Sequence, residues 1–212
     1  MSMYIYDYTV ATQPTELAVT LTDVKTHLRI SLLDVSQDSY LTFLIKAATL
    51  VAEKITKRIL ITKEFTTYRN ELFPLIQLRQ SKFQSLTSFK YLSNGSYLSI
   101  NSALFTTFIS SDYSTIVLND NSEYPDADNS YHAAQIIFKA GYGIDNTYIP
   151  SDLKMALLNH IAYLYENRGD CDMDVTNDDV IMNATPNTSK MVYLLYKIPD
   201  FIGQLESQFN NG

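Results

Sequence analysis

The strongest constraint on the fold is the stretch from Ser36 to about Arg58, where apolar residues recur three and four positions apart. This spacing predicts a long helix with one side in a core. Ser36 is the expected N-cap, and Lys57 and Arg58 fall in the last turn, where positive charge stabilises a helix end. The expected core stripe consists of Leu41, Leu44, Ile45, Ala48, Val51, Ala52 and Ile55.

The same helix has a second apolar stripe on its opposite side, formed by Phe43, Ala47 and Leu50. A helix predicted from Ser151 to about Arg168 also has two. Its core stripe is Leu153, Ala156, Leu157, His160, Ile161 and Leu164, and its opposite stripe is Met155, Leu158, Ala162 and Tyr165. Both sides of each helix must be covered, because burying one Phe or Leu contributes about 1.5–3 kcal/mol. Either the β-rich part of this chain or a neighbouring subunit provides the cover.

Between the two long helices the pattern is that of a β-rich segment. Threonine, aromatic and β-branched residues dominate from Thr62 to Gly143, and Asn94-Gly95 is a preferred pair for a tight hairpin turn. About six strands are expected here. The sequence therefore predicts an α+β fold, in which a small core of about four helices is interrupted by a β insertion.

The shorter helices and the domain boundaries follow from the same pattern. Thr22 is the expected N-cap of a helix over Asp23–Arg29, and a last short helix is expected over Ser189–Tyr196. The expected organisation is an N-terminal arm at 1–21, a helical core at 22–60 and 150–198, a β insertion at 61–149 and a tail at 199–212.

Composition excludes several classes of protein. The chain has 212 residues, a net charge of −7 and a single cysteine, Cys171. Sequence-independent nucleic-acid binding normally needs a basic patch, so this charge disfavours it. No apolar run reaches the ~18 residues of a membrane span, and no secretory signal is visible. We therefore expect a soluble intracellular protein without membrane partners.

The search for chemistry yields no cofactor, metal or catalytic site. The run Asp170–Asp174 begins like a calcium loop, but Val175 and Ile181 stand where that motif needs Gly and Glu. Cys171 lies among carboxylates, which disfavour a reactive thiolate. His160 lies on a core stripe, where a structural histidine is more common than a ligand or base. We therefore expect a protein that is not an enzyme.

Several phrases, in order, resemble the head–tail connector (adaptor) proteins of tailed bacteriophages and prophages. The first covers Val19 to Ile30 and Asp38 to Leu60 and contains Ile45, Ala47, Ala48, Glu53, Thr56 and Arg58 at the family's characteristic positions. The second, Ile136 to Arg168, has a strand that ends in AGYG, an IP helix start and a helix that ends in LYENR. The closing SKMVYLLYKIP is similar to the family's last short helix. The Pro usual before the strand at Leu86 is missing.

The resemblance implies a structural role in the virion. Family members form a ring of roughly twelve subunits beneath the portal protein, and some rings form only on the portal. The tail side of the ring meets the next neck or stopper protein, and DNA passes through without sequence-specific binding. Acidic residues suit such a channel, because negative charge passes a polyanion without holding it. The implied location is the head–tail junction, with assembly in the host cytoplasm.

A ring requires surfaces for two neighbours, and the second apolar stripes are suited to this. The candidate residues for subunit or partner contacts are Phe43, Ala47, Leu50, Lys54, Lys57, Met155, Leu158, Ala162 and Arg168. Two alternatives remain at this point. The first is a non-catalytic binding module with a concave aromatic pocket on the β insertion, which recognises a ligand or a host-surface molecule. The second is a hydrolase that uses His132 or His160.

Overall fold

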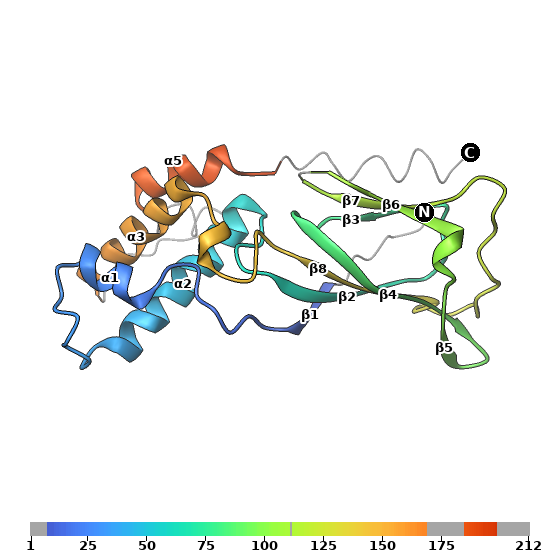
Figure 1. Cartoon of the computed structure of the whole chain (residues 1–212), viewed down its shortest axis with the longest axis horizontal. Coiled ribbons are helices and arrows are strands. Elements are labelled where there is room, and N and C mark those ends of the chain that lie inside the picture. Colours follow the sequence, from blue (N-terminus) through green and yellow to red (C-terminus); the bar gives the residue numbers. More distant parts are fainter. Residues whose placement is uncertain (1–7, 111, 169–184, 199–212) are drawn as a thin grey trace, which may run out of the picture. The chain divides into compact units, whose positions relative to one another are not determined.

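The computed structural model describes residues 8–110, 112–168 and 185–198. These residues form four α-helices, eight β-strands and two short 3-10 helices (Figure 1). They divide into two compact units. The helical unit lies within residues 14–61 and 142–198, and the β unit lies within residues 1–13 and 62–141. The predicted α+β fold is confirmed.

The helical unit contains α1 (Leu21–His27), α2 (Asp38–Thr56), α3 (Ser151–Glu166) and α5 (Asn187–Leu195). The long helices α2 and α3 pack their predicted core stripes into one apolar core. Its residues from these two helices are Leu41, Leu44, Ile45, Ala48, Ala52, Ile55, Leu153, Ala156, Leu157 and Ile161. Tyr193 of α5 is fully buried in the same core. No helix among the described residues is long and apolar enough to cross a membrane.

The starts of α1 and α2 differ from the predicted ones. Thr20, not Thr22, caps α1: its hydroxyl accepts the Asp23 N–H at 3.0 Å, and the Asp23 carboxylate accepts the Thr20 N–H at 3.3 Å. This reciprocal capping box needs an acidic residue three positions after the cap, and Thr22 lacks one. Ser36 does not cap α2, because its hydroxyl donates to Asp34 Oδ1 instead.

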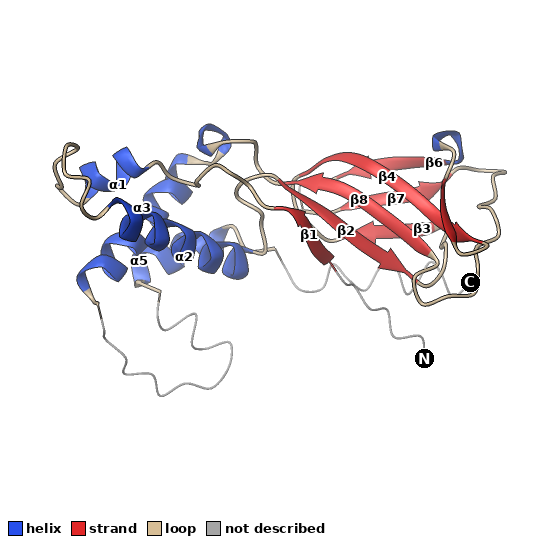
Figure 2. Cartoon of the chain, turned by 90° about the horizontal axis from the view of Figure 1, so that it is seen from below, coloured by secondary structure: helices blue, strands red, loops and turns tan. Residues whose placement is uncertain are grey.

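The β unit holds two antiparallel sheets. The larger has the order β1 (Tyr8–Thr12), β2 (Lys63–Arg69), β8 (Ala134–Ala140), β4 (Phe83–Ser93) and β5 (Ser96–Ser99), and Figure 2 shows β2, β8 and β4 side by side. The smaller has the order β3 (Leu75–Leu78), β7 (Ser114–Leu118) and β6 (Phe105–Ile109). The segment between α2 and α3 thus holds seven strands rather than about six.

The two sheets face each other across an aromatic core. In β8 alternate residues are buried, so Ile136 and Phe138 point inward as the period of a strand requires. The ring of Phe138 stacks on Phe65 of β2 at 5.7 Å and on Phe83 of β4 at 6.0 Å. Across the sheets, Phe89 of β4 meets Phe105 at 5.3 Å, edge to face. Offset and edge contacts of this kind are favourable for aromatic rings.

A buried arginine also links the two sheets. Arg69, at the end of β2, is 5% exposed. It donates to the Thr67 hydroxyl at 2.7 Å and to the Gln77 carbonyl of β3 at 3.2 Å. A buried guanidinium is stable only when such acceptors surround it.

Part of the segment expected as an N-terminal arm is paired or buried in the described structure. Tyr8–Thr12 forms β1, which pairs with β2 from Tyr8↔Thr67 to Thr12↔Glu64. Ala18 and Val19 are buried in the helical core. The backbone of residues 8–12 gains a hydrogen-bonding partner in β2, and the two small apolar side chains lose contact with water.

The β unit leaves and re-enters the helical unit at neighbouring points. Ile61 forms a parallel bridge with Gly143, and the Tyr142 N–H donates to the Ile59 carbonyl at 3.2 Å. A Cβ at Gly143 would clash with the Tyr148 side chain, so the close approach of Tyr148 requires glycine here. These contacts agree with the interpretation that Gly141-Tyr142-Gly143 turns the chain from strand to helix.

The capping box predicts a stability difference between two threonines. Thr20→Ala removes the hydroxyl that accepts the Asp23 N–H, so it should lower the free energy of unfolding by about 1 kcal/mol. Thr22→Ala is the matched control and should change it by less than about 0.5 kcal/mol, as expected for an exposed site. Urea denaturation measures both, and equal losses would contradict the assignment of the cap.

Candidate assembly surfaces

The side of α2 that faces away from the core is exposed. We call Phe43, Lys46, Ala47, Leu50 and Lys54 the α2 outer face. Phe43 is 65% exposed and Leu50 is 54% exposed, although both are large apolar side chains. Lys46 and Lys54 are exposed beside them, and Ala47 is partly buried. This is an apolar stripe with positive charge, and it matches the predicted second stripe.

The corresponding side of α3 is also exposed. We call Asp152, Met155, Asn159, Ala162 and Glu166 the α3 outer face. Met155 is 52% exposed, and Asp152 and Glu166 are exposed toward its two ends. Leu158 and Tyr165, which the sequence placed on this stripe, are instead partly buried against the core. The exposed apolar stripe on α3 is therefore narrower than predicted.

Two of the predicted contact residues have roles inside the unit. Lys57 is the C-cap of α2 and adopts the left-handed conformation with φ 57°. The Arg168 guanidinium lies 4.5 Å from the Tyr40 ring centre and 4.3 Å from that of Tyr165. It also donates to Gln37 Oε1 at 3.1 Å. Arg168 thus connects the end of α3 to the start of α2 through cation–π contacts and a hydrogen bond.

Other exposed apolar patches have no counterpart among the predicted contact residues, including Met191, Leu194 and Leu195 of α5. The loop between α1 and α2 exposes Leu32 (55%), Leu33 (91%) and Val35 (71%). Strand β6 exposes Phe108 and Ile109. The patch in the α1–α2 loop has a signal in the sequence, because three aliphatic residues fall within four positions and follow neither a helical nor a strand period.

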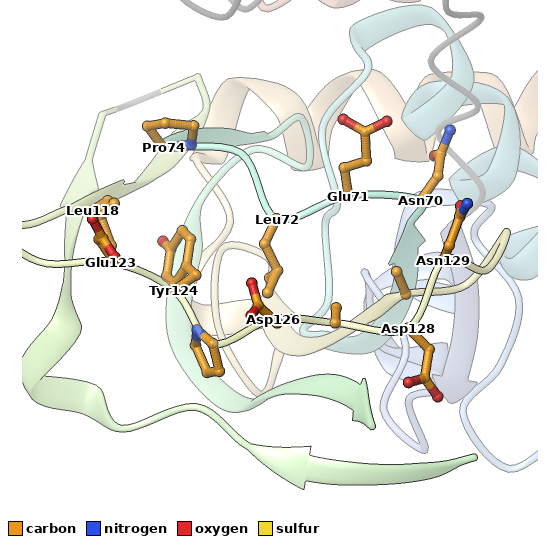
Figure 3. Close-up of a pocket in the computed structure, with 13 residues that line it drawn as sticks. Asn70, Glu71, Leu72, Pro74, Leu118, Glu123, Tyr124, Asp126, Asp128 and Asn129 are labelled. Atoms are coloured by element: carbon orange, nitrogen blue, oxygen red, sulfur yellow. The ribbon is translucent and has the colours of Figure 1, made fainter. Parts of the chain in front are cut away.

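The β unit contains an open pocket of about 510 Å³ (Figure 3). Its lining carries four carboxylates, from Glu71, Glu123, Asp126 and Asp128. Asp128 already accepts the N–H groups of Asn94 and Gly95, at 3.1 and 2.9 Å, which holds the β4–β5 turn. Tyr124 is the one aromatic residue in the described lining. This lining differs from the aromatic pocket that the binding-module hypothesis predicts.

The two histidines considered for catalysis differ in burial and lie in different units. His160 is 1% exposed in the helical core, and its Nδ1 lies 3.4 Å from the Tyr193 hydroxyl. Burial lowers its pKa to about 4. His132 is exposed in the β unit and stacks on Tyr68 at 4.3 Å. Among the described residues no group of three or more His, Cys, Asp or Glu could hold a metal ion. Asp170–Asp174, including Cys171, lies outside the described residues.

Three similar solved structures come from particles of a gene transfer agent (GTA). One is a chain from the neck of an empty GTA particle, solved with C6 symmetry. It has a TM-score of 0.72 and 18% identity, over 93% of this chain and 98% of that one. The fold is that of a particle-neck chain. The match extends over both units, so it concerns the whole architecture rather than one common motif.

The other two structures agree. A chain of the native GTA virion has a TM-score of 0.69 and 18% identity, over 92% of this chain and 97% of that one. A chain of the native GTA neck, solved with C12 symmetry, has a TM-score of 0.65 and 17% identity, over 93% and 98%. No family model and no curated protein matches the sequence.

The burial of His160 predicts a pH-dependent stability. Burial lowers its pKa to about 4 in the folded chain, from the ordinary value of about 6.5. Its stabilising effect is therefore complete above pH 6.5 and is lost as the pH falls toward 4, because the unfolded chain binds the proton first. The loss amounts to about 3 kcal/mol. Urea denaturation between pH 7 and 4 should show a steeper decline for the wild-type chain than for His160→Gln. Parallel declines would contradict this effect.

Proposed function

We propose that this chain is a structural subunit of the neck of a tailed phage or phage-like particle. In this role it is an adaptor that assembles as a ring between the portal protein and the tail-side neck or stopper protein. The role is structural and involves no catalysis. Its place is the head–tail junction of the virion, after assembly in the host cytoplasm.

The observation that carries this proposal is the extent of the structural match. A chain from a GTA neck has the same fold over 93% of this chain, with a TM-score of 0.72. Two of the similar structures were solved with C6 and C12 symmetry. A ring of twelve copies is compatible with both, and cyclic symmetry is the usual form of a closed homo-oligomer.

The outer faces of α2 and α3 support ring assembly. Phe43, Leu50 and Met155 are each more than half exposed, which is costly for an isolated chain in water. A cyclic ring needs two different surfaces on every subunit, one for each neighbour. The two outer faces belong to two helices and could meet two neighbours.

The charge of the chain supports a DNA channel. The net charge is −7, and the segment from residue 166 to the end contributes eight acidic and three basic residues. A negative lumen repels the DNA backbone, so DNA passes without being retained. A basic lumen in an assembled ring would overturn this part of the proposal.

The test is native mass spectrometry of the full chain over a concentration series, together with negative-stain images. A closed ring of about twelve copies supports the proposal. If the free chain is monomeric, it is co-expressed with the portal protein of the same particle, and a ring on the portal is then expected. A chain that stays monomeric both alone and with the portal overturns the proposal.

Leu50 provides a specific prediction. Leu50→Asp places a charge in the subunit contact, so it should lower association at least about tenfold, the equivalent of 1.4 kcal/mol. The fold should survive, because Leu50 is 54% exposed in the isolated chain. Ring formation is measured by native mass spectrometry and folding by circular dichroism.

Leu50→Met is the matched control and should assemble like the wild-type chain, because it keeps an apolar side chain of similar volume. Leu44→Asp places a charge at a position that is only 4% exposed in the helical core, so it should unfold the helical unit. If Leu50→Asp unfolds the chain as well, Leu50 is a core residue and not a contact residue.

A further inference from the structure

The outer faces of α2 and α3 carry opposite charges. The α2 outer face has Lys46 and Lys54 and no acidic residue, because Glu53 is buried. Within the described part of the chain, neither lysine forms an ion pair. Both ammonium groups are therefore available to a second molecule.

The α3 outer face is the acidic counterpart. The Glu166 carboxylate forms no ion pair or hydrogen bond with any described residue. Asp152 accepts the Tyr196 hydroxyl at 2.9 Å, a neutral donor that leaves the carboxylate charge in place. Lys154 lies about 100° around the helix from Met155, so it does not belong to this face. Each outer face thus has one sign of charge beside exposed apolar residues.

These charges determine which faces can pair. Two copies that met through α2 and α2 would bring lysines together, and two that met through α3 and α3 would bring carboxylates together. Both arrangements are repulsive. An α2 outer face against an α3 outer face brings opposite charges together. Such a contact is heterologous, so it propagates from copy to copy and can close into a ring.

The spacing of residues along the two helices also matches. Phe43 and Leu50 are seven residues apart, as are Met155 and Ala162, which is about 10.5 Å along a helix. Lys54 lies eleven residues after Phe43, and Glu166 lies eleven residues after Met155.

If the two helices run parallel, Phe43 faces Met155, Leu50 faces Ala162 and Lys54 faces Glu166. If they run antiparallel, Leu50 faces Met155 and Lys54 falls beside Asp152. Lys54 therefore has an acidic partner in either direction.

We infer that the α2 outer face of one copy docks on the α3 outer face of the next copy. This inference rests on the proposed ring and assigns the two surfaces that form each contact. Apolar residues occupy the centre of this contact. The charged residues determine that an α2 outer face pairs with an α3 outer face rather than with another α2 outer face.

Disulfide trapping tests the pairing even when association is weak. Cys171, the single cysteine, is first replaced by serine. A Leu50→Cys chain is then mixed with an Ala162→Cys or a Met155→Cys chain and oxidised. One of these mixtures should give at least about tenfold more linked pairs than a mixture with Leu195→Cys, because docking raises the effective thiol concentration. Leu195 is an exposed control position on α5, 83% exposed.

Charge reversal tests the role of Lys54. Lys54→Glu should weaken association about two- to fivefold per contact, and the loss compounds around a ring. Glu166→Lys should do the same. A mixture of the two chains should assemble again, with alternating copies, if the helices run parallel. In the antiparallel case Asp152→Lys restores assembly instead, and circular dichroism checks that this variant folds without its bond to Tyr196.

The outcomes separate the pairing from the ring itself. Linked pairs at the control rate, or Leu50→Cys chains that link to each other as readily as to either partner chain, overturn the pairing. If rings still form in that case, the proposed function stands and other surfaces make the contact. If the wild-type chain forms no ring alone or on the portal, the proposed function fails.

Discussion

The contact between the core stripes of α2 and α3 holds the helical unit together. Leu41 and Ile45 on one helix and Leu153 and Leu157 on the other are fully buried. Each contributes about 1.5–3 kcal/mol by its removal from water. The two helices are separated in sequence by the whole β unit, so this core forms only when distant segments meet. The smaller helices α1 and α5 complete it.

With one side of each long helix committed to this core, the other sides are available for assembly. The outer faces of α2 and α3 retain exposed apolar residues, and their charges are opposite in sign. Such exposed apolar surfaces are unfavourable for a monomer in water, whereas a ring subunit buries one surface against each of its two neighbours. The GTA-neck fold, the exposed stripes and the charge pattern therefore support the same proposal independently.

Helical periodicity allowed much of the fold and of the candidate surfaces to be predicted, because it is encoded locally. It identified the core stripes and a second apolar stripe on each helix, which contains Phe43 and Leu50 on α2 and Met155 on α3. It did not show how wide the buried side of α3 is, since α1 and α5 also pack on this helix. For that reason Leu158, which the periodicity places on the outer stripe, is instead partly buried against the core.

Features that depend on partners distant in the sequence are not predictable from local periodicity. Strand β1 forms because β2 pairs with it from more than fifty positions away. Lys25 is buried because Asp38 pairs with its ammonium group, and Arg69 is buried because acceptors from β2 and β3 surround it. No local pattern in the sequence signals these partners. The cap at Thr20 is different, because the three-residue spacing from Thr20 to Asp23 is a local signal of a capping box.

The closely spaced ends of the β unit have a thermodynamic consequence. Lys63 at the start of β2 pairs with Ala140 at the end of β8, so the folded β unit joins α2 to α3 as a short link would. If the β unit unfolds, the same ends are joined by a disordered chain of roughly eighty residues, and keeping them together costs about 4 kcal/mol in chain entropy. The two units therefore share part of their stability through the connectivity of the chain, and weakening the sheets also weakens the helices.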